Sequence, residues 1–393
     1  MKEDVITLRE GRLGKLQPAH PWIYKRQLKK SYTEARPGSI VRVENAQGVF
    51  IGRGYFNPKS EIAVRVLTFH DERIDVPFIR KRFEAALEKR CRVKETTDAY
   101  RAIYSEADAL PGLIVDIYGD TAVFQVLTLG MERMKELVVD MIGQTISPKH
   151  IYEKSVSVFR KIEGLRDHAR WWVEKRAMPV EIREGKARFL VDVEKSHKTG
   201  FYLDQRRSRM SLENIVKGKR VLDLFCYTGG FSVSAALFGA SEVSGVDIKE
   251  EWLALAKENA VLNGVAEKTT FARGDAFDVL RAYNRAGQTF DVVILDPPSF
   301  VKSARELRDA ARGYKELNLT AMKVLNNGGT LATFSCSHHM KNELFADIVK
   351  RAALDARKRF TILKRCHQAE DHPIVTSIPE TEYLKGYFLR VTT

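Results

Sequence analysis

One cysteine of the chain has the surroundings that a reactive thiol needs. Cys336 follows the strand-like run Gly328–Phe334, lies between two serines, and precedes His338 and His339. A structural cysteine normally has apolar neighbours, whereas a nucleophilic one needs partial exposure. A thiolate at such a place can add to carbon 6 of a cytosine, after which carbon 5 can accept a methyl group by in-line displacement. The other interpretation is a small residue tolerated at the end of a strand.

A second motif, Asp296-Pro297-Pro298-Ser299-Phe300, ends another apolar run. Two prolines cannot continue a strand, so they predict a rigid turn. Asp296 would then project into a cleft at the end of the strand, where a carboxylate can hold a ring nitrogen or an exocyclic amine of a base. Phe300 could stack on a base that is turned out of its helix. The alternative is a strand terminator followed by a packed phenylalanine.

A cofactor loop is predicted where the run Val221–Phe225 turns into a helix through Gly229 and Gly230. These glycines let the backbone approach a ligand closely, but their spacing is not the GxGxxG of nicotinamide enzymes. Asp247 ends the next run, where an acid can accept hydrogen bonds from both hydroxyls of a ribose. Asp275 ends a third run and could read an adenine edge, although an aspartate at a strand end is often only a helix cap.

These three strand-end features, the glycine loop, Asp247 and Asp275, together predict an adenosine-containing cofactor. The missing phosphate loop favours S-adenosylmethionine (SAM) over NAD or ATP. The residues expected to contact the cofactor in this region are Asp223, Phe225, Tyr227, Gly229, Asp247, Asp275, Asp296 and Pro297. A metal is not expected, because the histidine pair after Cys336 has no identifiable third ligand.

All of these motifs lie in the region 196–393, where strand-like and helical runs alternate. Strands are expected at 220–225, 242–247, 269–273, 291–295 and 329–336, and helices at 231–238, 250–263 and 304–325. This alternation predicts an α/β domain with a doubly wound parallel sheet, in which ligands bind beyond the carboxyl ends of the strands. The last runs, 360–364 and 386–391, have no clear helix between them and predict an antiparallel pair at the sheet edge.

Two further regions precede this one. Residues 1–75 predict a small β-rich domain with strands at 39–43, 47–53 and 62–69. Residues 76–195 predict a central α/β domain that begins with an amphipathic helix, on whose apolar stripe Cys91 would pack. Further strands are expected there at 113–118, 121–129 and 187–194, with a helix at 131–142.

A basic stretch from residue 12 to residue 30 holds six lysines and arginines, no acid and two aromatic residues. Such a stretch suits phosphate contact and base stacking, or else a solvated face with two buried rings. The residues predicted to contact RNA here are Lys15, Trp22, Lys25 and Arg26.

The composition agrees with a polyanionic partner. The chain has 393 residues with a formal net charge of +14, which favours nucleic acid without naming one. Its four cysteines include no CxxC pair, so a disulfide framework is not expected. We therefore expect the protein to work in the reducing cytoplasm. No apolar run approaches the ~18 residues of a membrane helix, and no secretory signal is apparent.

The chain resembles the rRNA large subunit methyltransferase I family, SAM-dependent enzymes that form 5-methylcytosine in 23S rRNA. The resemblance rests on motifs that occur along this chain in the same order as in the family. They are 20–24 (HPWIY), 200–206 (GFYLDQR), 223–230, Asp247, Asp275, 296–300 and 335–337. It implies an N-terminal PUA domain, a small central α/β domain and a Rossmann-like methyltransferase domain. It also implies that Tyr202, Asp204 and Arg206 help close the cofactor site, with Asp204 and Arg206 placed to match the charges of the methionine end. The partner implied is 23S rRNA or a large-subunit precursor; oligomeric state is open, a homodimer included.

One departure keeps other readings open. Many RNA 5-methylcytosine enzymes carry a second cysteine in the fourth-strand motif, and here that motif is Asp-Pro-Pro-Ser-Phe. The same motif resembles that of rRNA guanine methyltransferases, so the identity of the base depends largely on Cys336. The base that takes the carbon 5 proton is unassigned, with water and Asp296 as candidates. A guanine methyltransferase and a non-catalytic ribosome-assembly factor are the alternatives, and a nicotinamide oxidoreductase is a distant further one.

Overall fold

The computed structural model describes residues 4–11, 20–29, 35–300 and 306–392. The chain forms two compact units, each built from three segments. Unit 1 comprises Met1–Ile182, Val191–Leu203 and Glu370–Thr381, and unit 2 comprises Arg183–Leu190, Asp204–Ala369 and Glu382–Thr393. The finer division into 1–75, 76–195 and 196–393 stays a prediction.

The N-terminal part of unit 1 is a five-stranded sheet, as its β-rich composition predicts. In sheet order its strands are β1 (Asp4–Thr7), β3 (Ile40–Glu44), β4 (Phe50–Phe56), β5 (Ile62–Thr68) and β2 (Trp22–Tyr24). The three expected strands correspond to β3, β4 and β5. Strands β1 and β2 were not expected, because each is only three or four residues long. Ile6, Ile23 and Val64 lie in the small apolar core of this sheet.

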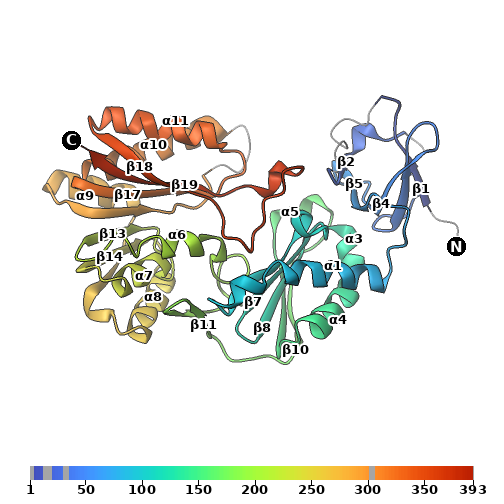
Figure 1. Ribbon diagram of the computed structural model, residues 1–393, viewed down its shortest axis with the longest axis horizontal. Coiled ribbons are helices and arrows are strands. Elements are labelled where there is room, and N and C mark those ends of the chain that lie inside the picture. The colour runs from blue at the N-terminus through green and yellow to red at the C-terminus, as the bar shows by residue number, and fades with distance from the viewer. Residues whose placement is uncertain (1–3, 12–19, 30–34, 301–305, 393) are drawn as a thin grey trace. The chain divides into compact units, whose positions relative to one another are not determined.

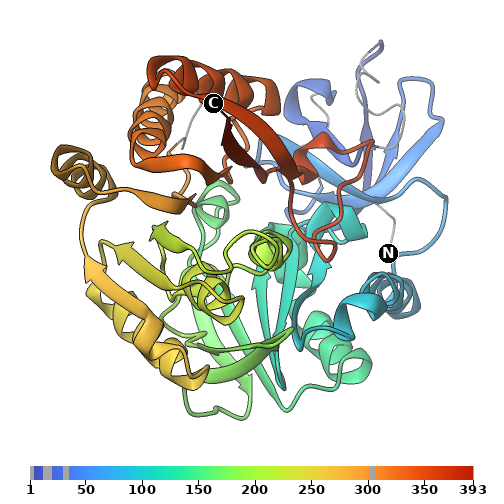
Figure 2. The ribbon, with the colours of Figure 1, turned by 60° about the vertical axis from the view of Figure 1, so that its left-hand side comes forward.

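A second five-stranded sheet completes unit 1. Its strands are, in order, β10 (His168–Val173), β9 (His150–Ser155), β8 (Thr121–Val126), β7 (Leu113–Tyr118) and β6 (Ala99–Tyr104). Helices α1 (Val76–Glu88) and α4 (Lys135–Thr145) pack into the core on one of its faces (Figure 2). The shorter helices are α2 (Cys91–Lys94), α3 (Leu129–Arg133) and α5 (Val158–Ile162), and β11 (Val180–Glu184) pairs with β12 (Ala187–Val191).

The prediction that Cys91 packs on the stripe of the first helix is wrong. Helix α1 ends at Glu88, and Cys91 is exposed at the start of α2. The buried place after the helix is taken by Arg90, whose guanidinium forms two hydrogen bonds with the carboxylate of Asp108, at 2.8 and 2.7 Å. The helical periodicity does not continue across this break, so the side chain at 91 turns outward.

Unit 2 contains the doubly wound sheet that the alternating pattern predicts. In sheet order its strands are β15 (Thr269–Arg273), β14 (Glu242–Asp247), β13 (Arg220–Leu224), β16 (Phe290–Leu295), β17 (Leu325–Ser335), β19 (Lys385–Thr392) and β18 (Arg359–Cys366). The first five strands are parallel, and β19 runs antiparallel to both of its neighbours. The expected antiparallel pair at the sheet edge is therefore confirmed.

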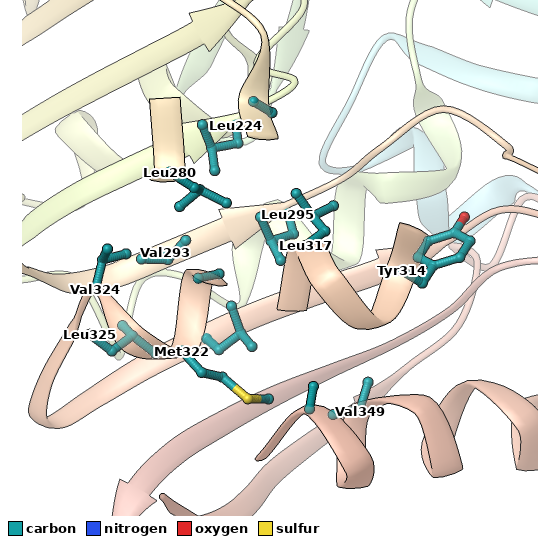
Figure 3. Packing of buried hydrophobic residues seen from close by; sticks show 14 of the residues in the cluster. Leu224, Leu280, Val293, Leu295, Tyr314, Leu317, Met322, Val324, Leu325 and Val349 are labelled. Carbon is teal, nitrogen blue, oxygen red and sulfur yellow. The ribbon is translucent and has the colours of Figure 1, made fainter. Parts of the chain in front are cut away.

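Helices cover both faces of this sheet (Figure 1). They are α6 (Arg206–Met210), α7 (Gly230–Leu237), α8 (Glu250–Leu262), α9 (Ala276–Ala286), α10 (Leu307–Lys323) and α11 (Asn342–Asp355). Helices α9, α10 and α11 share one apolar core with the strands, and Figure 3 shows Leu317 of α10 beside Leu295 of β16. Because β13 to β17 are parallel, their carboxyl ends meet at one edge of the sheet. All three predicted motifs follow these ends.

Candidate active site

The loop between β13 and α7 has an unusual backbone. Phe225, Tyr227 and Gly229 have φ angles of +66°, +51° and +80°. The loop is held against the end of β14, since the amide of Tyr227 donates to Asp247 Oδ2 at 3.0 Å. Left-handed conformations in non-glycine residues cost of order 1–3 kcal/mol and cluster at ligand sites. This loop therefore has the backbone expected of a close ligand contact.

Asp223 lies at the base of that loop and is completely buried. Ser232 Oγ donates to its Oδ2 at 2.6 Å, while its Oδ1 has no hydrogen-bond partner among the described residues. Burial raises the pKa of Asp223 to about 7, and the nearby Asp296 and Asp247 carboxylates add to this rise.

Asp223 Oδ1 belongs to a set of buried oxygens that lack a partner in the described part of the chain. Others at this end of the sheet or in the segment before it include Gln205 Oε1, Thr228 Oγ1, Thr333 Oγ1 and Ser337 Oγ. Buried polar atoms are normally satisfied, so such a set indicates a polar ligand or water. The ammonium, hydroxyl and adenine groups of SAM are donors of the required kind, so the residues present fit this cofactor.

Asp247 and Asp275, two further acids of the predicted cofactor site, differ in their surroundings. Asp247 ends β14 half-buried, and its carboxylate accepts from the amides of Tyr227 and Lys249. Asp275 is exposed and caps α9, accepting from the amides of Phe277 at 2.9 Å and Asp278 at 3.3 Å. Asp275 thus acts as a helix cap, the alternative role that the sequence allowed. Its contact with a cofactor stays a prediction.

The motif after β16 lies near Asp223, on which Asp296 acts electrostatically. Gln205 Nε2 donates to Oδ1 of the half-buried Asp296 at 2.9 Å, and Pro297 is buried. Phe300 is half-buried, with its ring centroid 4.7 Å from that of Tyr314. The ring is therefore part of an aromatic cluster at the edge of the core, and its stacking on a base stays a prediction.

Cys336 directly follows the last residue of β17 and is half-buried. Cys226 and Cys366 are buried instead, and burial raises the pKa of both thiols. Beside Cys336, Ser335 Oγ donates to the hydroxyl of Tyr314 at 3.0 Å. Cys336 and Asp296 both act electrostatically on Tyr314, so the ends of β16 and β17 converge there. Cys336 thus combines partial exposure with polar neighbours.

A buried lysine, which sequence analysis missed, lies at the same place. Lys385 begins β19, and its Nζ donates to the carbonyl oxygens of Ser337 and Met340, both at 2.6 Å. The available signal was one charged residue inside the otherwise uncharged run Tyr383–Leu389.

The segment before the sheet contributes to both units. In unit 2, Asp204 is buried and accepts from the hydroxyl of Tyr383 at 2.6 Å, and the buried Arg206 begins α6. In unit 1, the hydroxyl of Tyr202 lies 3.4 Å from His197 Nδ1, and Lys198 Nζ lies 5.3 Å from the centre of its ring. Their roles toward the cofactor stay predictions.

The predicted RNA contacts near the N-terminus are only partly described. Trp22 is half-buried, and its Nε1 donates to Glu106 at 2.9 Å. Lys25 and Arg26 follow β2 in a short turn, where Arg26 is exposed. Lys15 lies outside the described residues.

Neither a metal cluster nor a membrane helix is found where the structure describes the chain. No group of three or more His, Cys, Asp or Glu side chains among those residues could hold a metal ion. Within the same ranges, no helix is both long and apolar enough to cross a bilayer.

Comparison with known proteins identifies the fold and the family. A family model of S-adenosylmethionine-dependent methyltransferases matches residues 155–375, and a PUA-like domain model matches residues 6–69. A candidate methyltransferase complexed with SAH shares the fold, with a TM-score of 0.86 at 21% identity over 99% of this chain and 100% of the other. Fold, site and family model therefore define a SAM-dependent methyltransferase with an N-terminal PUA-like domain.

Full-length relatives give the narrower family. The chain is 40% identical over 392 residues to the ribosomal RNA large subunit methyltransferase I of Shewanella denitrificans, which covers 98% of this chain and 99% of the relative. It is 41% identical over 391 residues to the protein of the same name from Aeromonas hydrophila, at 98% of both chains. The chain belongs to the ribosomal RNA large subunit methyltransferase I family.

Proposed function

We propose that this protein methylates carbon 5 of a cytosine in 23S rRNA, with Cys336 as the nucleophile. The observation that carries the proposal is the half-buried Cys336 immediately after β17, near the Asp296 motif that follows β16. The names of its relatives, which refer to large-subunit ribosomal RNA, support the substrate class.

The chemistry explains why a nucleophile is needed. Carbon 5 of cytosine is too electron-poor to take a methyl group directly. The Cys336 thiolate forms a carbon–sulfur bond at carbon 6, and the electron pair of the 5,6 double bond moves toward carbon 5. After methylation, a base removes the carbon 5 proton, the double bond forms again, and the cysteine leaves as thiolate. Asp296 or a water molecule is the base in this scheme.

When bound, SAM supplies the methyl group on its sulfonium centre. Asp247 would accept hydrogen bonds from ribose hydroxyls. The positive-φ loop from Phe225 to Gly229, whose Tyr227 amide donates to Asp247, would let the backbone approach the ligand. Asp204 and Arg206, both buried in unit 2, would take the ammonium and carboxylate of the methionine end. Asp296 would hold the target base against the cofactor.

Substitution of the nucleophile tests the mechanism. We expect Cys336→Ser to abolish methyl transfer to rRNA while SAM affinity by calorimetry stays unchanged, because the hydroxyl is a far weaker nucleophile than a thiolate. Cys91→Ser, at an exposed cysteine, is the matched control and should keep full activity. A fully active Cys336→Ser enzyme would exclude the thiolate mechanism and favour methylation of guanine or another base.

The modified base itself is identified by labelling. Radiolabelled methyl transfer to rRNA from a strain that lacks this protein, followed by mapping of the product, should yield 5-methylcytosine at one position. A methylated guanine would assign the alternative activity. Failure to bind SAM would favour a non-catalytic assembly factor.

Two further expectations belong to this proposal. Action on ribosomal RNA or its precursor places the enzyme in the cytoplasm. A homodimer stays a prediction that light scattering of the purified chain can decide.

A further inference from the structure

The Lys385 side chain is fixed at both ends by the fold. Its Cα is the cross-strand partner of Ser335 in the antiparallel pairing of β17 with β19. Its Nζ donates to the carbonyl oxygens of Ser337 and Met340, both at 2.6 Å. Lys385 therefore contacts the chain on either side of Cys336 and is itself only 5% exposed.

The charge of this lysine acts on the cysteine. The groups that interact electrostatically with Lys385 are Cys336, which comes first in strength, then Glu382 and Lys341. Burial lowers the pKa of Lys385 to about 8, while a negative charge on Cys336 opposes that decrease. The ammonium and a thiolate thus stabilise each other, and both hydrogen bonds of the ammonium go to neutral carbonyl oxygens.

A second lysine, the half-buried Lys358, forms the same kind of hydrogen bonds in a purely structural role. Lys358 Nζ donates to the carbonyl oxygens of Met322 at 2.9 Å and Leu325 at 2.6 Å. Burial lowers its pKa as well, with no charged group contributing to the decrease. Lys358 and Lys385 share the same bonding pattern, but of the two only Lys385 has ionisable neighbours that act on it, and Cys336 is the strongest of these.

We propose that Lys385 is a positioning residue for Cys336, which holds the segment 335–340 in place and stabilises the thiolate by its charge. The inference rests on the proposed role of Cys336 as nucleophile. The thiol proton leaves to bulk water, and at neutral pH, below its own pKa of about 8, Lys385 is protonated beside the sulfur. A cation close to a cysteine is a general means of raising its thiolate fraction at neutral pH.

The test is the pH profile of Cys336 alkylation by iodoacetamide, followed by mass spectrometry of the peptide that contains it. Thiolate sulfur displaces iodide, so the rate reports the thiolate fraction without SAM or RNA. We expect Lys385→Met and Lys385→Gln to move the midpoint upward by about one pH unit and to slow alkylation roughly tenfold at neutral pH. Lys385→Arg retains the charge and should keep most of the native profile.

Controls separate charge from folding. Lys358→Met removes a lysine with the same bonding pattern and should leave the profile unchanged. Lys385→Gln keeps a hydrogen-bond donor, so it decides the outcome where Lys385→Met fails to fold. A native profile in a folded Lys385→Gln protein overturns the proposal, even if methyl transfer is lost.

The two proposals fail in different ways. If alkylation shifts as expected but Cys336→Ser remains fully active in methyl transfer, the electrostatic coupling stands and the nucleophile assignment fails. If Cys336→Ser is inactive and alkylation is indifferent to Lys385, the nucleophile stands and the role of Lys385 is wrong.

Discussion

Asp223 combines complete burial with ionisable chemistry. Its carboxyl group has one oxygen bonded to Ser232 and one without a partner in the described ranges, in a region that also holds Asp247 and Asp296. A buried carboxylate without a cation is costly, so the neutral form is favoured until a ligand supplies a donor. The free energy of unfolding therefore depends on whether Asp223 is protonated.

This coupling predicts a pH-dependent effect of Asp223→Asn. Because burial raises the pKa from 3.8 to about 7, the folded protein binds more protons than the unfolded chain between these values. The stability that this provides is fully present below about pH 4 and is lost as the pH rises through 7. Without SAM, the variant should therefore gain free energy of unfolding relative to wild type as pH rises, by up to ~4 kcal/mol. Urea unfolding at several pH values measures this, and a pH-independent difference would contradict it.

At the scale of elements, the turn between β13 and α7 determines how close the backbone comes to a ligand. Gly229 has a φ of +80°, and a Cβ there would lie 3.1 Å from the Cβ of Ala256 in α8. Gly287, which follows α9, has a φ of +66° and open space around it. The two glycines thus share a left-handed backbone conformation, which glycine adopts freely, but differ in location and in the space around them.

We expect Gly229→Ala and Gly287→Ala each to cost about 1–2 kcal/mol of stability, because an L-residue resists the left-handed conformation. Only Gly229→Ala should also weaken SAM binding, since its loop lies at the predicted cofactor site. Calorimetric titration with SAM compares the two variants. Equal SAM affinity in both would argue against a cofactor role for the loop.

At the scale of the whole molecule, the net charge of +14 suits a large polyanion. The chain carries basic residues widely, so total charge alone does not locate the RNA surface. The turn after β2 offers a specific candidate, with Arg26 exposed and its guanidinium 5.5 Å from the ring of Tyr24.

Charge reversal at Lys25 and Arg26 tests that surface. We expect the double variant to bind rRNA more weakly and with a flatter salt dependence, the slope of log affinity against log salt falling by about two. Reversal of the exposed Lys257 and Lys268 changes net charge equally and serves as the control. An unchanged slope in the first variant would remove this turn from the RNA interface.

Much of the catalytic unit could be predicted because its signals are local. Proline pairs end strands, glycines permit tight turns, and apolar runs alternate with amphipathic ones, all within a few residues. These signals were enough to locate the strands that precede Asp247, Asp296 and Cys336. Helices α9 and α11 were missed, although Ala276, Leu280 and Tyr283 recur at helical spacing in α9 after the Asp275 cap.

The sequence by itself thus determined the order of strands and motifs, and with it the family and the cofactor. Tertiary structure alone decided which distant side chains join them: Gln205 on Asp296, Tyr314 on Ser335 and Lys385 around Cys336. The physical reason is the distance along the chain over which each interaction acts. A turn or cap depends on neighbours a few residues away, whereas the pairing of Lys385 with Ser335 depends on the register of two strands 50 positions apart, which no local pattern specifies.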